Sequence, residues 1–528
     1  MCENAALVLN RMTLYYSLTR EETMPKQRIF LSGVTGAMGF PCLKALLEDK
    51  DEIELVILAR PSKENKKKLK PFSGVSCLTI VWGDLTNYSD VKTCAQNADI
   101  VLHLGGLVSP KADYQPELTM RINVSSTVNI VRAVKELNQV DKTRVVFIGT
   151  VAETGERMPP IHWGRVGDPV KPAVFDYYAV SKTAAERYLI ESGLQWVSLR
   201  QTGIIGPVMA DIEDAIMFHQ GLDNVLEYAS DRDSAVMLRN LCRKERQGIL
   251  GNNFWGHIFN IGGGESCRIS AYNLYKKLFA EIGITNLSYV MDSNWSATLN
   301  FHGQYYLDSD KLNDILCFRN DGMEYFYEAY LKKLGGIAVM ARIITKLPGG
   351  QKMMGGIIKK RFHKLTKTEN GTMRFIEENM EDHIAVFWGS KEAYKAIAPM
   401  DKFIPFSDYN KAAHINHGYD ESKPEAELNL KDVKEAAVFR GGECLSESMT
   451  TGSWTEKLKF RCAFGHEFDA SPRLVLEGGH WCPVCERESW NYHERAKVDP
   501  FFAQVWYPLH DKNEKERKFI KKFSELNV

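Results

Sequence analysis

The sequence predicts an α/β fold, in which a doubly wound parallel sheet with a small substrate-binding portion is followed by an α+β metal-binding module. Two observations lead to this prediction. Short apolar runs alternate with helical stretches up to about residue 330, which is typical of strands and crossover helices. Near the C-terminus, cysteine and histidine residues form two closely spaced pairs, which is typical of a metal site.

Composition narrows the classes of protein that fit. The chain has 528 residues, with 67 acidic and 67 basic side chains, so its overall charge neither attracts nor excludes nucleic acid or anionic membranes. Eleven cysteines and an opening segment that makes a poor signal peptide favour reduced thiols. We therefore expect a cytoplasmic protein. The first 23 residues, before Met24, are either an extension or an overextended start.

The first strand, turn and helix are predicted in "RIFLSGVTGAMGFPCLKALLE". Gly33, Gly36 and Gly39 lie three apart between an apolar run and a stretch with helical periodicity. Glycines allow a tight turn and a close approach of the backbone to a pyrophosphate at the helix N-terminus. This pattern, with the buried strands that follow, predicts a Rossmann-type dinucleotide-binding sheet.

The end of the second predicted strand indicates the cofactor. About 20 residues after Gly39, where enzymes that use NAD place an acid, this chain has Arg60. A guanidinium could receive a 2′-phosphate, so NADP(H) is favoured over NAD(H). We expect the run Lys66, Lys67 and Lys68 to be a solvated cluster instead.

"FDYYAVSKTAAERY" holds a candidate catalytic pair. Tyr178 and Lys182 are four apart and share one face of a helix, whereas Tyr177 points elsewhere and is expected to pack or to lie at a pocket rim. An ammonium beside a phenol favours the phenolate, so we expect Lys182 to lower the pKa of Tyr178.

Together these motifs resemble the extended short-chain dehydrogenases/reductases, the group that includes NAD-dependent epimerases and dehydratases. The resemblance covers about residues 28 to 330, through "GVTGAMG", "GDL", "HLGG", "NVSST", "FIGT", the Tyr/Lys pair, "LRQTGIIGP" and "FNIGGGE". It implies a catalytic triad of Thr150, Tyr178 and Lys182. The resemblance implies contact with the cofactor for Tyr178 and Lys182 and for Gly33, Thr35, Gly36, Ala37, Met38, Gly39, Arg60, Asp84, Leu85, Leu104, Gly105, Gly106, Asn123, Gln201, Thr202 and Gly203.

This resemblance implies an NAD(P)-dependent oxidoreductase that transfers hydride between nicotinamide and a carbonyl or alcohol, with Tyr178 as general acid/base. One alternative is a sugar-nucleotide epimerase or dehydratase that holds its cofactor tightly. Another is a non-catalytic protein that responds to a dinucleotide. The loop "TVAETGERMPPIHWGRVGDP" departs from the sugar-nucleotide branch, from which we expect an altered substrate entrance. His162 in that loop is expected to be an ordinary loop residue.

The last segment, "CAFGHEFDASPRLVLEGGHWCPVC", resembles treble-clef or zinc-ribbon modules. Cys462, His466, Cys482 and Cys485 have the chemistry and spacing of one structural Zn²⁺ site. His480 and Cys444 are interpreted as non-ligands.

We therefore divide the chain into an N-terminal extension (1–27), the dinucleotide-binding domain (28–335), a helical connecting region (336–440) and a zinc-binding domain (441–528). The connecting region is basic and partly apolar. Such a surface could touch a membrane or an acidic partner, and a solvated helix face that packs on the first domain is the favoured interpretation. The expected partner is a small-molecule substrate. Family analogy suggests a homodimer, there is no strong sign of nucleic acid or membrane, and the zinc module is expected to make intramolecular or protein contacts.

Overall fold

The structure is a computed structural model, and it describes residues 25–251 and 253–526. The predicted extension over residues 1–27 lies outside this part except for its last three residues. Among the described residues, no helix combines the length and the apolar character needed to cross a membrane.

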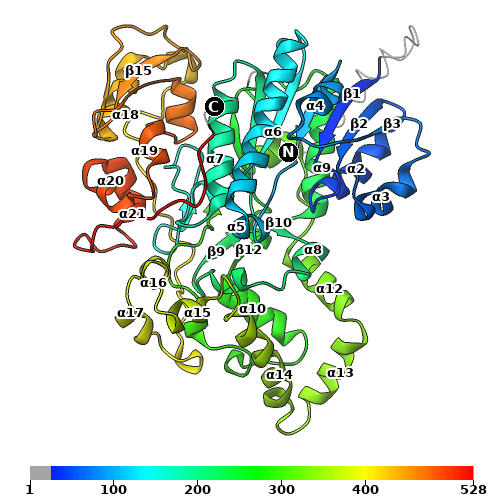
Figure 1. The fold of residues 1–528 in the computed structure, drawn as a ribbon, viewed down its shortest axis with the longest axis vertical. Coiled ribbons are helices and arrows are strands. Elements are labelled where there is room, and N and C mark those ends of the chain that lie inside the picture. The colour runs from blue at the N-terminus through cyan, green and yellow to red at the C-terminus, as the bar shows by residue number, and fades with distance from the viewer. Residues whose placement is uncertain (1–24, 252, 527–528) are drawn as a thin grey trace.

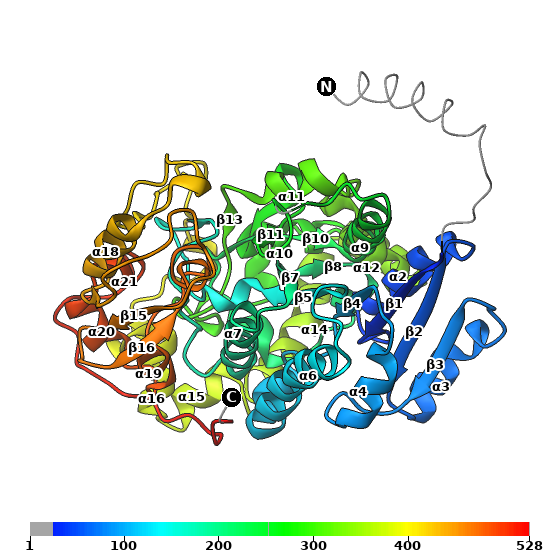
Figure 2. The ribbon, with the colours of Figure 1, turned by 90° about the horizontal axis from the view of Figure 1, so that it is seen from above.

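A parallel sheet of seven strands forms the core of the first domain, and its strands are labelled in Figure 2. Its order is β11-β7-β5-β4-β1-β2-β3, with every neighbouring pair parallel. The strands are β1 (Gln27–Ser32), β2 (Ile53–Ala59), β3 (Leu78–Trp82), β4 (Ile100–His103), β5 (Arg144–Thr150), β7 (Gln195–Gln201) and β11 (Ile258–Ile261). The chain runs outward from β1 in both directions, so a crevice is expected at the carboxyl ends of β1 and β4.

Helices cover both faces of this sheet, as the alternating sequence pattern predicted (Figure 2). One face packs against α4 (Tyr88–Ala95), α6 (Pro116–Glu136) and α7 (Tyr177–Ile190). The other packs against α2 (Gly39–Leu46), α9 (Asp231–Arg246) and α11 (Ser309–Leu316). Apolar strand residues are buried on both sides, which explains why the strands read as continuous apolar runs.

Short elements beyond β7 build a smaller portion over the carboxyl edge of the sheet. They are β8 (Ile204–Ile205), α8 (Pro207–Ala210), a 3₁₀ turn (Ala215–Phe218), β9 (Val225–Glu227), β10 (Ala229–Ser230), β12 (Arg268–Ser270) and α10 (Ala271–Ala280). Met217, Phe218 and Leu222 of this portion pack into a core shared with the helices that follow.

The region after residue 320 begins with a chain of helices. These are α12 (Met323–Leu334), α13 (Gly336–Thr345), α14 (Gly350–Leu365), α15 (Thr372–Glu377), α16 (Glu381–Trp388) and α17 (Lys391–Lys395). In Figure 1, α13 and α14 lie at the end of the molecule farthest from the sheet.

The C-terminal part combines a small antiparallel sheet with short helices. The strands are β14 (Glu443–Cys444), β15 (Leu458–Arg461) and β16 (Glu467–Ala470), and the helices are α18 (Leu430–Phe439), α19 (Pro483–Arg487), α20 (Tyr492–Val498) and α21 (Pro500–Trp506). Its core residues belong to the same hydrophobic cluster as α6 and α7. This part is therefore packed on the first domain.

Candidate functional site

The glycine loop after β1 packs tightly against the end of β4. Gly33 has a φ of +71°, and a Cβ there would lie 2.6 Å from backbone atoms of Leu104 and Gly105. A Cβ on Gly39 would lie 2.1 Å from the carbonyl oxygen of Gly33. Only glycine fits these positions. The loop leads directly into α2, whose N-terminus can receive a phosphate.

The other predicted cofactor residues are distributed along the same edge. The parallel register pairs Ser32 with His103, and Thr150 with Gln201, so the glycine loop, the β4 end and the β5 and β7 ends lie at one side of the sheet. Leu85 closes the space beside Gly105, where an added Cβ would lie 2.3 Å from the Leu85 Cδ1 atom. The sheet thus brings together Gly33–Gly39, Leu85, Leu104–Gly106 and Gln201–Gly203.

Asn123 makes three hydrogen bonds within the protein. Its Oδ1 atom accepts from the Leu107 N–H at 2.7 Å, and its Nδ2 donates to the Leu107 carbonyl and to the Ser181 hydroxyl at 3.0 and 2.8 Å. These bonds use both Nδ2 protons and one lone pair of Oδ1. Asn123 therefore ties the loop after β4 to α7, and its contact with the cofactor stays a prediction.

Arg60 is exposed just beyond β2, beside the glycine loop. Lys68, expected to be solvated, instead donates to the Thr35 carbonyl at 2.8 Å and lies 4.3 Å from the centre of the Phe40 ring. Burial lowers the pKa of Lys68. Its place follows from α3 (Lys63–Leu69), which returns the chain toward the loop. A charge run alone gave no sign of this.

Thr150 and Tyr178 meet at the carboxyl end of β5. The Thr150 Oγ1 atom accepts from the Ala152 N–H at 3.2 Å, and the Thr150 hydroxyl lies close enough to the Tyr178 phenol to lower its pKa. Burial raises the pKa of Tyr178 well above 10; the Thr150 hydrogen bond opposes this rise, and the nearby Glu153 and Asp176 carboxylates add to it. The phenol is thus held neutral.

Lys182 lies one turn along α7, with its Nζ atom 3.9 Å from the centre of the Phe147 ring. Burial lowers the pKa of Lys182 to about 8, against the opposing effect of Glu153 and Glu186. The expectation that Lys182 lowers the pKa of Tyr178 is therefore wrong for this structure. Desolvation of the phenol outweighs the expected effect of a neighbouring cation.

A buried charge network behind the triad was missed in the sequence. The Arg200 Nε atom lies 3.2 Å from Glu153, and its Nη2 atom lies 2.6 Å from Glu186; all three side chains are at most 1% exposed. Although burial opposes ionisation, Arg200 and His480 hold the pKa of Glu186 well below its usual range. Burial and Glu186 raise the pKa of Glu153.

Glu153 also accepts from the Thr150 N–H at 2.9 Å and completes a capping box. The pattern Thr-x-x-Glu from Thr150 was the available signal.

Tyr177 points away from the pair and packs against the C-terminal part, where it contacts the Trp490 and Phe523 rings. The loop after β5, expected at the substrate entrance, is also covered by C-terminal residues. Its His162 is fully buried and bonded to the Tyr409 carbonyl at 2.8 Å. His162 is an interior residue outside the triad.

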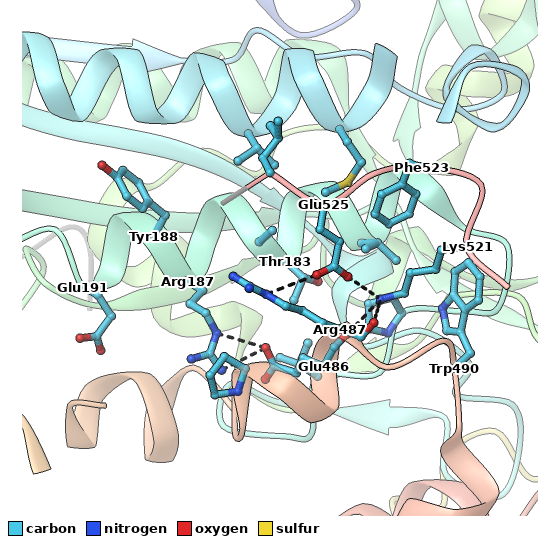
Figure 3. A pocket seen from close by; sticks show the side chains of 18 of the residues that line it. Thr183, Arg187, Tyr188, Glu191, Glu486, Arg487, Trp490, Lys521, Phe523 and Glu525 are labelled. Atoms are coloured by element: carbon cyan, nitrogen blue, oxygen red, sulfur yellow. Dashed lines mark hydrogen bonds and ion pairs between the residues drawn. The ribbon is translucent and has the colours of Figure 1, made fainter. Parts of the chain in front are cut away.

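A cavity of about 280 Å³ separates α6 and α7 from the C-terminal part (Figure 3). Arg187 of α7 and Glu486 of α19 face each other across it at 3.0 Å, and Lys521 and Glu525 close one side. None of the three triad residues lines it. The cavity therefore lies between the C-terminal part and helices α6 and α7, and it is separate from the triad.

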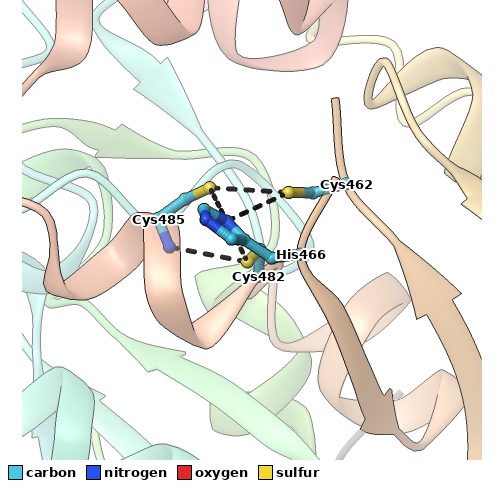
Figure 4. A group of neighbouring side chains, drawn as sticks. All are labelled: Cys462, His466, Cys482 and Cys485. Carbon is cyan, nitrogen blue, oxygen red and sulfur yellow. Dashed lines mark hydrogen bonds between the residues drawn. The ribbon is translucent and has the colours of Figure 1, made fainter. Parts of the chain in front are cut away.

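The two cysteine and histidine pairs converge at one point (Figure 4). Their ligand atoms all lie within 4.8 Å of one another. The Cys462 and Cys485 sulfurs are 3.7 Å apart, and the His466 Nδ1 atom is 3.4 to 3.7 Å from the three sulfurs. A tetrahedron with Zn–S bonds of about 2.3 Å has edges of about 3.8 Å, so the four donors fit Zn²⁺.

The two other candidate ligands lie apart from this cluster. His480 bonds Glu186 at 3.2 Å, and Cys444 lies on β14. Their interpretation as non-ligands agrees with these positions.

The first domain is similar to known proteins. Residues 29–240 match the model of the NAD dependent epimerase/dehydratase family. The chain is 25% identical over 249 residues to the 3 beta-hydroxysteroid dehydrogenase type 7 of Mus musculus, covering 44% of this chain and 63% of the mouse protein. It is 24% identical over 208 residues to the 3-beta-hydroxysteroid dehydrogenase of Mycolicibacterium neoaurum, covering 38% and 52%. The chain thus spans less than two thirds of either relative.

Two solved structures are similar at low identity. The UDP-glucuronic acid 4-epimerase of Bacillus cereus with NAD is 21% identical, covers 58% of this chain and all of its own, and has a TM-score of 0.43. The dTDP-glucose 4,6-dehydratase of Streptomyces venezuelae with NAD is 18% identical, covers 59% and 98%, and has a TM-score of 0.45. Residues 29–240, which carry the glycine loop, most of the doubly wound sheet and the helix with Tyr178 and Lys182, thus match the NAD dependent epimerase/dehydratase family.

Proposed function

We propose that the chain is an NADP(H)-dependent oxidoreductase that interconverts a carbonyl compound and its alcohol. The observation that carries this proposal is the contact between the Thr150 hydroxyl and the Tyr178 phenol, on the sheet edge that also bears the glycine loop. Both curated relatives are named as hydroxysteroid dehydrogenases, which favours an apolar, ring-bearing secondary alcohol or ketone as substrate.

The space beside the glycine loop suits a dinucleotide. The glycine loop leaves backbone room at the N-terminus of α2, and Arg60 and Lys68 provide positive charge at its outer side. When bound, the nicotinamide supplies or accepts the hydride. The 2′-phosphate preference assigned to Arg60 is part of the proposal.

In this proposal, Tyr178 donates the proton and Thr150 orients its phenol. Since the Thr150 oxygen already accepts from the Ala152 N–H, its own proton is free to point at the phenol oxygen. The neutral Tyr178 can then give its proton to the developing alkoxide of a carbonyl substrate. A phenol with a raised pKa suits the donation step, so reduction is the direction proposed at neutral pH.

Replacement of one hydroxyl tests this role. Tyr178→Phe should lower kcat/KM for carbonyl reduction by about 10²- to 10⁴-fold, while the Kd for NADPH stays within about threefold. Tyr177→Phe is the matched control and should retain activity, because its ring packs on Trp490 and Phe523. Turnover that survives in Tyr178→Phe would remove the assignment.

The family description also favours a second candidate, an epimerase or dehydratase that regenerates its cofactor in each cycle. The same triad could serve it. Conversion of a sugar nucleotide by protein with co-purified dinucleotide, and with no net change in nicotinamide absorbance, would support this candidate over the first.

We also propose that Cys462, His466, Cys482 and Cys485 hold one structural Zn²⁺. All four positions are protein donors, which leaves no open position for a substrate. Metal analysis of the purified chain should find about one zinc per molecule, and Cys482→Ser should lose it. Cys444→Ser, a buried cysteine outside the cluster, should keep it.

A further inference from the structure

Helices α13 and α14 carry large apolar side chains on their outer surface. Ile337, Val339, Met340, Ile343, Leu347, Met353 and Ile357 are each between 56% and 62% exposed. We call these seven residues the apolar tip. Soluble proteins rarely expose such a concentration of apolar side chains without a binding role.

The polarity of α13 is inverted relative to a normal surface helix. The buried face of α13 consists of Ala338, Ala341 and Thr345, and Thr345 donates to the Ala341 carbonyl at 2.8 Å. The buried positions of α14 are Gly350 and Gly355. On α13, small residues thus face the protein and large apolar ones face outward, opposite to the arrangement expected when water surrounds the helix. Helix α14 packs Met354, Ile358 and Phe362 against the core. It carries Met353 and Ile357 on its exposed side as well.

Positive charge surrounds the apolar tip. Between Leu331 and Thr368 the sequence holds ten lysines and arginines and no acidic residue. Five of these cations pair with carboxylates of other segments, as Lys333 does with Asp211 and Arg361 with Glu213. The remaining five make no ion pair within the described part of the chain; they are Lys332, Lys346, Lys352, Lys360 and Lys364.

The unpaired lysines lie next to the apolar side chains. On α14, Met353, Ile357, Lys360 and Lys364 follow one another at helical spacing and share a face. Lys346 directly precedes Leu347. This combination of an apolar face with a basic rim is typical of helices that lie in the interface of an anionic membrane.

We propose that the apolar tip docks the protein on an anionic lipid surface, without crossing it. The positive charge around the tip favours an anionic bilayer over a second copy of the chain. A second copy of the chain would bring the same cations against one another, because a two-fold interface joins equal surfaces. An anionic bilayer supplies both the negative headgroups and an apolar layer for the tip. The tip lies at the end of the molecule farthest from the sheet, where it can reach a flat surface (Figure 1).

Vesicle flotation of the full chain tests the proposal. The protein should float with vesicles of phosphatidylcholine and phosphatidylserine, bind less to phosphatidylcholine alone, and be released by high salt. Met340→Glu with Ile343→Glu should reduce the bound fraction by at least about tenfold, since it places two carboxylates in the apolar layer. Ile249→Glu, at a position that is 57% exposed in the loop after α9, is the matched control and should bind as the wild type does.

A second variant separates charge from apolar contact. Lys346→Ala with Lys360→Ala and Lys364→Ala should reduce the preference for phosphatidylserine while weak binding to neutral vesicles stays unchanged. Thermal midpoints of all variants should match that of the wild type, because the altered side chains are exposed. A wild-type chain that stays unbound with both vesicles overturns the proposal. So does a tip variant that floats like wild type, or one whose only effect is to dissociate an oligomer.

Discussion

Burial at the triad sets the protonation state of two residues in opposite directions. It raises the pKa of the Tyr178 phenol and lowers the pKa of Lys182 to about 8, because each charged form loses hydration. At neutral pH the phenol is protonated and most of the lysine is an ammonium. A neutral proton donor beside a cation is a suitable arrangement for reducing a carbonyl.

The lowered pKa of Lys182 predicts an alkaline limit to activity. The ammonium is the form present below about pH 8, so kcat/KM should be level below this pH and fall above it as the proton is lost. A pH profile of the wild type measures the limit. In Lys182→Arg, whatever activity remains should not show it, since arginine stays charged. A limit that persists in this variant would assign the titration to another group.

Arg60 and Lys68 should affect cofactor binding differently. Arg60→Ala should raise the Kd for NADPH by about 10- to 100-fold and leave that for NADH unchanged, because only NADPH carries the 2′-phosphate. Lys68→Ala should weaken both, since Lys68 holds the Thr35 carbonyl of the glycine loop. Lys66→Ala is the control for loss of charge. Equal losses for both cofactors in Arg60→Ala would contradict the NADP(H) preference.

At the scale of elements, one buried arginine joins α7 to both the sheet and the C-terminal part. Arg200 on β7 joins Glu153 after β5 to Glu186 on α7, and it donates to the Gly478 carbonyl at 2.7 Å. The helix that carries Tyr178 and Lys182 is thereby bound to the sheet and to the C-terminal part at one point.

Breaking this network should be costly. Arg200→Met leaves two buried carboxyl groups without their cation, and it should lower the free energy of unfolding by about 3 to 5 kcal/mol. Urea denaturation measures the loss. Arg132→Met, which removes an ion pair whose arginine is 56% exposed, should leave the urea midpoint close to that of the wild type. Similar small losses in both variants would show that the network contributes little.

At the scale of the whole molecule, the part that carries the cysteine and histidine cluster is an integral layer of the fold. Arg187 on α7 lies 3.0 Å from Glu486, which follows the ligand Cys485 directly. His480, near the ligand Cys482, bonds Glu186. The segment that closes the metal cluster is therefore the same one that contacts the helix of the triad.

Removal of the metal should therefore lower both the stability of the protein and its activity. A chelator should lower the melting temperature by several degrees and reduce kcat in parallel, and added Zn²⁺ should restore both. Comparison with Cys482→Ser and Cys444→Ser distinguishes metal loss from thiol loss. Full activity in protein shown to lack zinc would mean that the metal cluster does not support the triad.

Much of the fold and part of the site could be predicted from local pattern. The glycine spacing, the buried strand runs and the Tyr178/Lys182 spacing all act over a few residues, and the doubly wound sheet is confirmed. The cysteine and histidine cluster was also readable, because each pair lies within five residues, and its occupancy by Zn²⁺ stays a prediction. The substrate, the NADP(H) preference, the partners and the cytoplasmic location stay predictions.

The sequence by itself determined the order of strands and helices, the glycine loop and the candidate ligands, since these depend on backbone geometry and short spacing. Only the tertiary structure decided that Asn123 supports the loop after β4, that Arg200 links α7 to Gly478, and that the apolar tip faces outward. The physical reason is distance along the chain: Arg200 and Gly478 are 278 residues apart. Desolvation and long-range charge pairs depend on which segments meet, and local sequence does not specify that.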